Sequence, residues 1–202
     1  MSSIVIAGNT SGAITIAAPA EAGLNTLTLP ASTGTLATTA DIPAGGKILQ
    51  VVSVEKTDIF STTSSMPTYA DITGLSATIT PSSSSSKILV TISVKVSNLT
   101  GYFSTQLKRQ IGGASFTIVH GGDSSYPSLG TAYARQTIEF YLATMQQGGT
   151  FLDSPNTTSA VTFKVGAARG GGTCYVNRTG HIAPDATRPG TSSTITLMEV
   201  AG

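Results

Sequence analysis

The chain is poor in the residues that several classes of protein require. Its 202 residues include one cysteine, Cys174, which excludes an internal disulfide framework and a cysteine-rich zinc site. Charged residues make up only 10%, and the net charge of +1 provides no positive surface for nucleic acid. A membrane span needs about eighteen consecutive apolar residues, and no apolar run in the sequence is that long, so we expect no membrane insertion. Residues 1–9 lack a basic region and a long apolar core, so we expect no secretory signal.

Serine and threonine take the place of the missing charge. The sequence has 25 serines, 32 threonines and 22 glycines, and hydrophobic residues reach an ordinary 40%. This apolar content is enough to build a core, which argues against disorder. Surface charge normally keeps a soluble monomer apart from its neighbours. We therefore expect this nearly uncharged chain to hide part of its surface in an assembly.

Residues 1–46 differ from the rest of the chain. They contain no lysine or arginine, and short apolar pieces recur at Ile4–Ile6, Ile14–Ile16 and Leu27–Leu29. Glycine, asparagine and proline separate these pieces, which is typical of short strands joined by turns. Because a hairpin of this size is marginally stable by itself, we predict a β-rich attachment and oligomerisation segment completed by copies from other chains. The alternative is a flexible leader of low complexity.

Residues 47–202 have the pattern of an all-β domain that begins after Gly45-Gly46. The clearest strand is Lys87–Val96, where five aliphatic residues alternate with polar ones, as expected for a sheet with one buried face. Glycine pairs and triplets, Gly148-Gly149 among them, are predicted to separate the strands. We predict an antiparallel β-sandwich or jelly roll. The other expected strands are Lys47–Val54, Ser76–Thr80, Tyr102–Arg109, Ser115–Val119, Ala134–Met145, Ala160–Val165, Thr173–Asn177 and Ser193–Val200.

No motif for catalysis or cofactor binding is present. His120 lies near Asp123 in a glycine-rich stretch, which is typical of a loop and does not supply the oriented base of nucleophilic catalysis. Three copies of one histidine around a threefold axis are the remaining route to a metal site. The acidic residues after position 100 are scattered and not paired as glycoside hydrolysis requires. We therefore predict a non-enzymatic protein with no cofactor, and we interpret Cys174 as a buried small hydrophobic residue.

Loop residues are the candidates for ligand contact. Aromatic and polar side chains on loops bind sugars by stacking and hydrogen bonding, and function concentrates in such loops. Core packing is the alternative for each residue taken alone, and it applies also to the further candidates Tyr102, Phe103 and Tyr133. The predicted ligand-binding residues are His120, Asp123, Tyr126, Asn177 and Arg178.

The order of several short segments resembles a known group of viral proteins. Ser11–Pro19, Ala22–Pro30 and Thr33–Leu36 resemble the repeats of tail-fibre and virion structural proteins of tailed bacteriophages. Further segments resemble the terminal domain of the same group: Ala77–Pro81 leading into Ser86–Val90, then Phe151–Pro155, Tyr175–Arg178 and Ser193–Glu199.

This resemblance implies a non-enzymatic virion component, usually a homotrimer, assembled in the host cytoplasm. Its N-terminal part would attach to the particle. Its C-terminal jelly roll, similar to the C1q and tumour necrosis factor group, would point outward.

Three functions are compatible with these features. The first is a short fibre or spike, bound to other virion proteins by residues 1–46 and contacting a host-surface glycan through the domain of residues 47–202. The second is a capsid decoration protein or head fibre that stabilises the phage head. The third is a spike that degrades polysaccharide.

Overall fold

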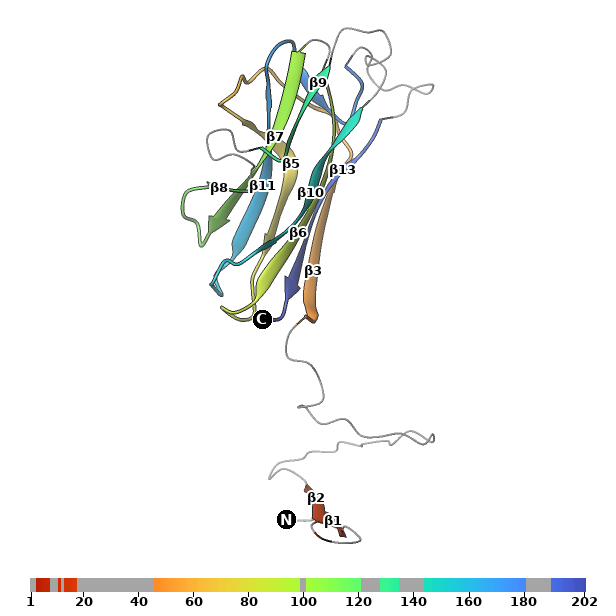
Figure 1. The fold of residues 1–202 in the computed structure, drawn as a ribbon, viewed down its shortest axis with the longest axis vertical. Helices are drawn as coiled ribbons and strands as arrows, with labels where there is room; N and C mark the ends of the chain where they lie inside the picture. The colour runs from red at the N-terminus through yellow and green to blue at the C-terminus, as the bar shows by residue number, and fades with distance from the viewer. Residues whose placement is uncertain are drawn as a thin grey trace. The chain divides into compact units, whose positions relative to one another are not determined.

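The structure is a computed structural model that describes residues 3–7, 11, 13–17, 46–98, 101–120, 128–134, 144–180 and 190–202. The chain divides into two compact units, Met1–Ile42 and Pro43–Gly202. Every regular element of the described residues is a β-strand (Figure 1). The predicted all-β class is therefore confirmed.

The first unit contains a small antiparallel hairpin. Strand β1 (Ser3–Ala7) pairs with β2 (Ala13–Ala17), in a register that sets Ile4 opposite Ile16 and Ile6 opposite Ile14. These strands match two of the three apolar pieces in the sequence, and the third, Leu27–Leu29, lies outside the described residues. The side chain of Ile6 is 56% exposed. The hairpin thus pairs within one chain and leaves apolar surface uncovered.

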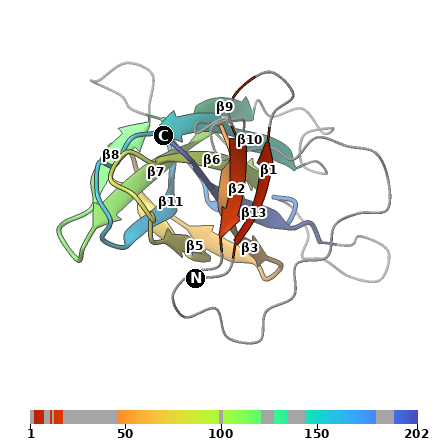
Figure 2. The ribbon, with the colours of Figure 1, turned by 90° about the horizontal axis from the view of Figure 1, so that it is seen from below.

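The second unit is a two-layered sandwich. Its strands run along its length in Figure 1, and the view along them in Figure 2 shows the two sheets on opposite sides. The strands are β3 (Ile48–Lys56), β4 (Phe60–Thr62), β5 (Ala70–Ile79), β6 (Lys87–Asn98), β7 (Gly101–Ile111), β8 (Thr117–His120), β9 (Gly130–Ala134), β10 (Met145–Asp153), β11 (Val161–Arg169), β12 (Cys174–Val176) and β13 (Ser193–Val200).

The strand order is that of a jelly roll. The first long strand pairs with the last, β3 with β13, and the following pairs are β5 with β11, β6 with β10, and β7 with both β8 and β9. Two further pairings, β13 with β6 and β11 with β7, join these hairpins into sheets. The sheets are therefore β3-β13-β6-β10, extended by β12 and β4, and β5-β11-β7-β8, with β9 also beside β7. Such a doubly folded hairpin is the antiparallel jelly roll predicted for residues 47–202.

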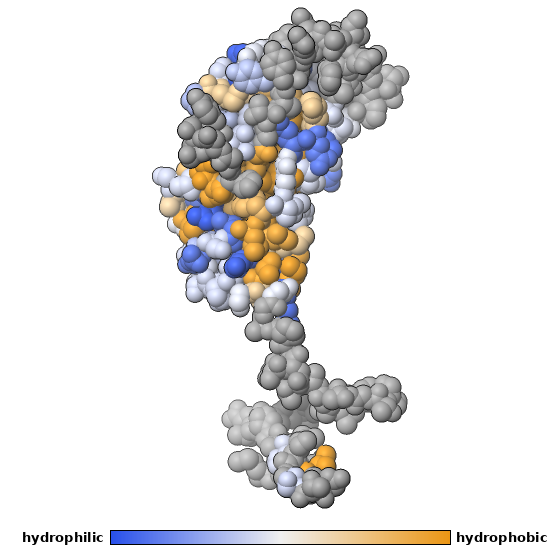
Figure 3. Space-filling model, in the orientation of Figure 1, coloured by the Kyte–Doolittle hydropathy of each residue, from blue (hydrophilic) through white to orange (hydrophobic). Residues whose placement is uncertain are grey.

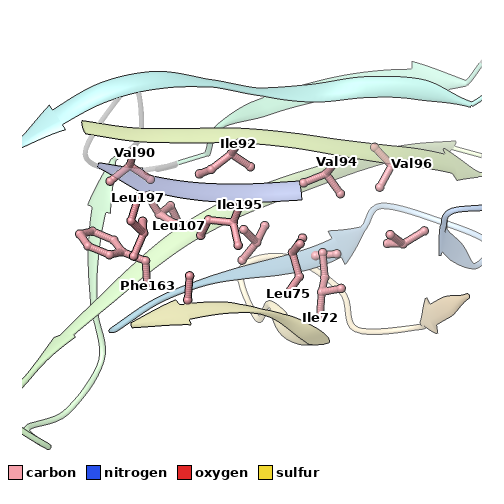
Figure 4. Packing of buried hydrophobic residues seen from close by; sticks show 14 of the residues in the cluster. Ile72, Leu75, Val90, Ile92, Val94, Val96, Leu107, Phe163, Ile195 and Leu197 are labelled. Atoms are coloured by element: carbon pink, nitrogen blue, oxygen red, sulfur yellow. The ribbon is translucent and has the colours of Figure 1, made fainter. Parts of the chain in front are cut away.

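The core lies between the two sheets. Alternate residues of β6 from Ile88 to Val96 are at most 2% exposed, as the alternating pattern predicts. Leu107, Phe163 and Leu197 approach them from β7, β11 and β13 (Figure 4). Full burial of each aliphatic or aromatic side chain contributes about 1.5–3 kcal/mol.

Two polar contacts also connect the sheets. The Arg109 guanidinium on β7 donates to both carboxylate oxygens of Asp153 on β10, at 2.7 and 2.9 Å. The buried hydroxyl of Thr105 on β7 donates to Oε1 of Gln147 on β10 at 3.0 Å. Because β7 and β10 belong to different sheets, these bonds fix how one layer sits on the other.

Several strand limits differ from the prediction. Gly148 and Gly149 lie inside β10 and do not interrupt it. A Cβ at Gly148 would overlap the carbonyl oxygen of Ile92, so glycine there permits close approach of two backbones within a strand. Of the strand expected over 134–145, Ala134 ends β9, Met145 begins β10, and residues 135–143 lie outside the described residues. Strand β4 lies where no strand was expected.

Candidate functional site

The structure places three of the five predicted ligand-binding residues. His120 ends β8, with its backbone opposite Leu107 half-way along β7. Asn177 and Arg178 directly follow β12, which belongs to the other sheet. Asp123 and Tyr126 lie outside the described residues. The described candidates are therefore divided between the two sheets.

Asn177 is an interior residue. Its side chain is fully buried, and its amide nitrogen donates to the carbonyl oxygens of Lys56 at 2.8 Å and Asp58 at 3.0 Å. Its Oδ1 accepts a hydrogen bond from the Ser193 hydroxyl at 2.6 Å. Its backbone has the left-handed φ of 64°, which asparagine tolerates better than most residues. These contacts hold the end of β3 against β13, so the buried Asn177 side chain presents no surface to a ligand.

Arg178 is half-buried beside an aromatic ring. The carbon of its guanidinium lies 4.3 Å from the centroid of the Tyr175 ring, within the range of a cation–π contact. Its Nε donates to the carbonyl oxygen of Thr179 at 3.0 Å. These contacts hold a planar cation and an aromatic surface together. Of the other aromatic candidates, Phe103 is buried in the core, whereas Tyr102 is 37% exposed.

A charged cluster lies on the outward face of the β5-β11-β7-β8 sheet. Asp71 on β5 accepts hydrogen bonds from Lys108 on β7 and Lys164 on β11. Burial raises the pKa of Asp71, but the bonds from the two lysines outweigh it and hold that pKa below its ordinary value. The Lys164 ammonium also lies 3.6 Å from the ring centroid of Phe116. Single-sequence reasoning missed this cluster because its members are distant in the chain.

An apolar row crosses the outward face of the other sheet. The registers place Val51 opposite Met198, Met198 opposite Leu89, and Leu89 opposite Leu152, so β3, β13, β6 and β10 each contribute one residue. We name these four residues the apolar row. Hydrophobic side chains are visible on the lower half of the sandwich in Figure 3.

The sequence contains a local signal for this row. Each of its residues stands next to a core-facing apolar residue, as in Val51-Val52 and Leu89-Val90. Neighbouring residues of a strand face opposite sides, so such a doublet puts one apolar residue outside.

The described residues form no candidate metal site. They contain no group of three or more histidine, cysteine or acidic side chains that could hold a metal ion. Burial raises the pKa of the Cys174 thiol to about 12, and the interpretation of this residue as a buried hydrophobe is confirmed. Within the same part of the chain, no helix has the length and apolar character needed to cross a membrane.

No family model matches this chain, and no curated protein matches it. Three solved structures from infectious bursal disease virus are similar in part. The structure of the Gx strain has 12% identity and a TM-score of 0.36, over 85% of this chain and 46% of that one. The VP2 subviral particle has 12% identity and a TM-score of 0.33, over 75% and 39%. The T=1 particles have 13% identity and a TM-score of 0.34, over 96% and 45%.

This chain spans less than half the length of each of those chains. The jelly-roll assignment rests on the strand order alone, because similarities this weak carry no argument about the fold.

Proposed function

We propose that this protein is a structural component of a virus particle: a short, homotrimeric fibre or spike of a tailed bacteriophage. Its N-terminal unit attaches the chain to other virion proteins, and its jelly roll contacts a glycan on the host surface. The observation that carries this proposal is the difference between the two ends of the jelly roll. The chain enters from the N-terminal unit at one end, and Arg178 lies near the other end.

Backbone contacts define the attached end. Gly46 donates to the carbonyl oxygen of Ala201 at 3.2 Å, and Ala201 donates to that of Lys47 at 2.8 Å. The segment that leads to the first unit therefore leaves the sandwich beside the end of β13. Arg178 follows β12, which pairs with the opposite end of β6, from Val96 to Asn98. Arg178 therefore lies at the end of the sandwich opposite to the one where the chain enters it, and three copies would multiply a weak sugar contact.

A non-enzymatic role is supported by three of the described carboxylates, those of Asp71, Asp153 and Glu199. Glycoside hydrolysis requires a carboxylic acid with a raised pKa near a second carboxylate. Burial raises the pKa of Asp71 and that of Glu199, but hydrogen bonds to both carboxylates outweigh it and leave each pKa lowered. Asp153 is paired with Arg109. Asp71 and Glu199 are therefore poorly suited to donate a proton, and Asp153 serves a structural contact with Arg109.

The position on the particle is tested by labelling intact virions with an antibody to this chain and imaging them. Label on the tail or on projecting fibres is the expected result. Particles assembled with a chain that lacks residues 1–42 should lose the label. Label spread across the shell would contradict the fibre proposal.

Host contact is tested with two matched variants, each of which replaces one cationic side chain by alanine. Arg178→Ala, at the far end, should reduce adsorption of the purified protein to host cells. Lys87→Ala removes an exposed cation near the attached end and should leave adsorption unchanged. Equal adsorption of both variants would remove Arg178 from the contact.

The second candidate function is a capsid decoration protein or head fibre. The apolar row favours it, because an exposed apolar surface can be buried against a shell. In that case particles without this protein should lose capsid stability on heating but keep normal adsorption.

A further inference from the structure

Salt bridges neutralise some of the described cations and leave others without a carboxylate. Four of these cations are paired with aspartates: Lys56, Lys108, Arg109 and Lys164. Lys95 and Arg178 are half-buried, but in the described part of the chain no carboxylate forms a salt bridge with either. The Lys95 ammonium donates to Oε1 of Gln146, and Nε of Arg178 donates to the carbonyl oxygen of Thr179. Both acceptors are neutral, so an anion at these cations would offset the loss of water that burial causes.

The backbone anchors both cations to one stretch of β6. The Asn177 backbone amide donates to the carbonyl oxygen of Lys95 at 2.9 Å, and the Ser97 hydroxyl donates to that of Arg178 at 2.7 Å. Lys95 and Ser97 lie on one face of β6, because alternate residues of a strand point the same way. Tyr175, whose ring lies against the Arg178 guanidinium, is opposite Ser97 in the register of β12 and β6. We name Lys95, Tyr175 and Arg178 the cationic patch.

The guanidinium of Arg178 keeps hydrogen-bond donors for a ligand. Its Nε is used by Thr179 and one of its faces lies against Tyr175, whereas its two terminal nitrogens make no hydrogen bond to the described residues. Those nitrogens donate in the plane of the group, in a geometry that matches the two oxygens of a carboxylate. The contacts with Tyr175 and Thr179 restrict the side chain before a ligand arrives, which reduces the entropy lost on binding.

We propose that the cationic patch binds a sugar that carries a carboxylate, such as a uronic acid residue, within the host-surface glycan. The inference rests on the proposed function, which supplies the glycan contact, and it adds the chemical class of the sugar. The carboxylate accepts hydrogen bonds from the terminal nitrogens of Arg178, and Lys95 contributes a second positive charge. Glu55, an acidic residue of the same sheet, lies on β3, which β13 separates from β6. A neutral sugar would leave both positive charges uncompensated.

The first test needs no substitution in the protein. Polysaccharide extracted from the host surface is divided, and in one half the carboxylates are activated with carbodiimide and reduced to alcohols. The wild-type full chain should bind the carboxyl-reduced half about tenfold or more weakly than the native half, because charge-assisted hydrogen bonds are lost. The reduction leaves sulfate and phosphate groups intact, so it separates a carboxylate from other anions.

The outcomes separate this inference from the proposed function. If both preparations bind equally well, the glycan contact stands, and the assignment of a carboxylate is wrong. If neither preparation binds, both the glycan contact and the cationic patch are wrong.

Variants of the full chain locate the contact. Arg178→Lys keeps the charge but removes the planar pair of donors, and it should weaken binding to the native polysaccharide about tenfold. Lys95→Gln should weaken the same binding severalfold. The matched control is Lys47→Gln, which removes an exposed cation where the chain enters the sandwich and should leave binding unchanged. Wild-type binding by both patch variants would overturn the proposal, and so would an equal loss in the control, which would indicate unspecific charge attraction.

Discussion

A single buried carboxylate provides the sharpest test of the polar architecture. Glu199, near the end of β13, is 1% exposed. Its Oε1 accepts hydrogen bonds from the Ser82 backbone amide at 2.7 Å and from the Ser82 hydroxyl at 2.6 Å, and its Oε2 accepts one from the Gln50 amide at 2.7 Å. The carboxylate therefore joins the β5–β6 connection to β13 and β3. Glu199→Gln keeps the shape of the side chain but sets an NH₂ group against one of these donors.

The magnitude follows from the pKa of Glu199. Burial raises this pKa, but the bonds from Ser82 and Gln50 outweigh it and lower the pKa from an ordinary 4.5 to about 2. At ~1.4 kcal/mol for each pH unit, the charged form contributes about 3 kcal/mol to folding. Because the folded-state pKa is depressed, this stability is present above pH 4.5 and is lost as the pH falls toward 2. Glu199→Gln should therefore cost about 3 kcal/mol at pH 7 and about 1 kcal/mol at pH 3.

The measurement is urea unfolding of the full chain at fixed protein concentration, at several pH values between 2 and 7. The control is Glu55→Gln on β3, which makes the same chemical change at an exposed position and should alter stability by less than ~0.5 kcal/mol. If Glu199→Gln were as stable as wild type at pH 7, or if its deficit did not change with pH, the role given to this carboxylate would be wrong.

Three further predictions concern the second unit. Asn177→Gly keeps the left-handed backbone but removes the three side-chain hydrogen bonds, two of which are buried, so chemical unfolding should show a loss of about 2–3 kcal/mol. Asn156→Gly, at an exposed residue with a φ of 51°, should change stability little. Arg109→Ala should lower the free energy of unfolding by about 2 kcal/mol in the wild-type chain, and by less in a chain that already carries Asp153→Ala. If the losses in this double-mutant cycle were additive, the link between the sheets would be disproved. Deletion of residues 1–42 should leave the sandwich folded, with a cooperative thermal transition by calorimetry; loss of that transition would show that the two units fold together.

The local alternation of apolar and polar residues predicted most of the strands. The alternation from Lys87 to Val96 predicted which residues of β6 face the core, because period two is a property of any strand with one buried face. The same local rules failed at Gly148. There, glycine serves a close approach to Ile92, a residue more than fifty positions away in the sequence.

The functional surfaces were harder to predict than the strands. Asn177 has the sequence context of a loop, but the tertiary structure buries it. Its amide nitrogen donates hydrogen bonds to the carbonyl oxygens of Lys56 and Asp58. The apolar row joins Val51 to Leu152, and only the registers of three strand pairs bring these residues onto one face.

The sequence by itself determined the all-β class, the scarcity of charge and the inward face of the strand Lys87–Val96. These follow from composition and from neighbours along the chain. Only the tertiary structure decided which strands lie side by side and which outward residues meet, because any alternating strand can pair with many others. The choice among partners depends on burial and hydrogen bonds summed over the whole sandwich.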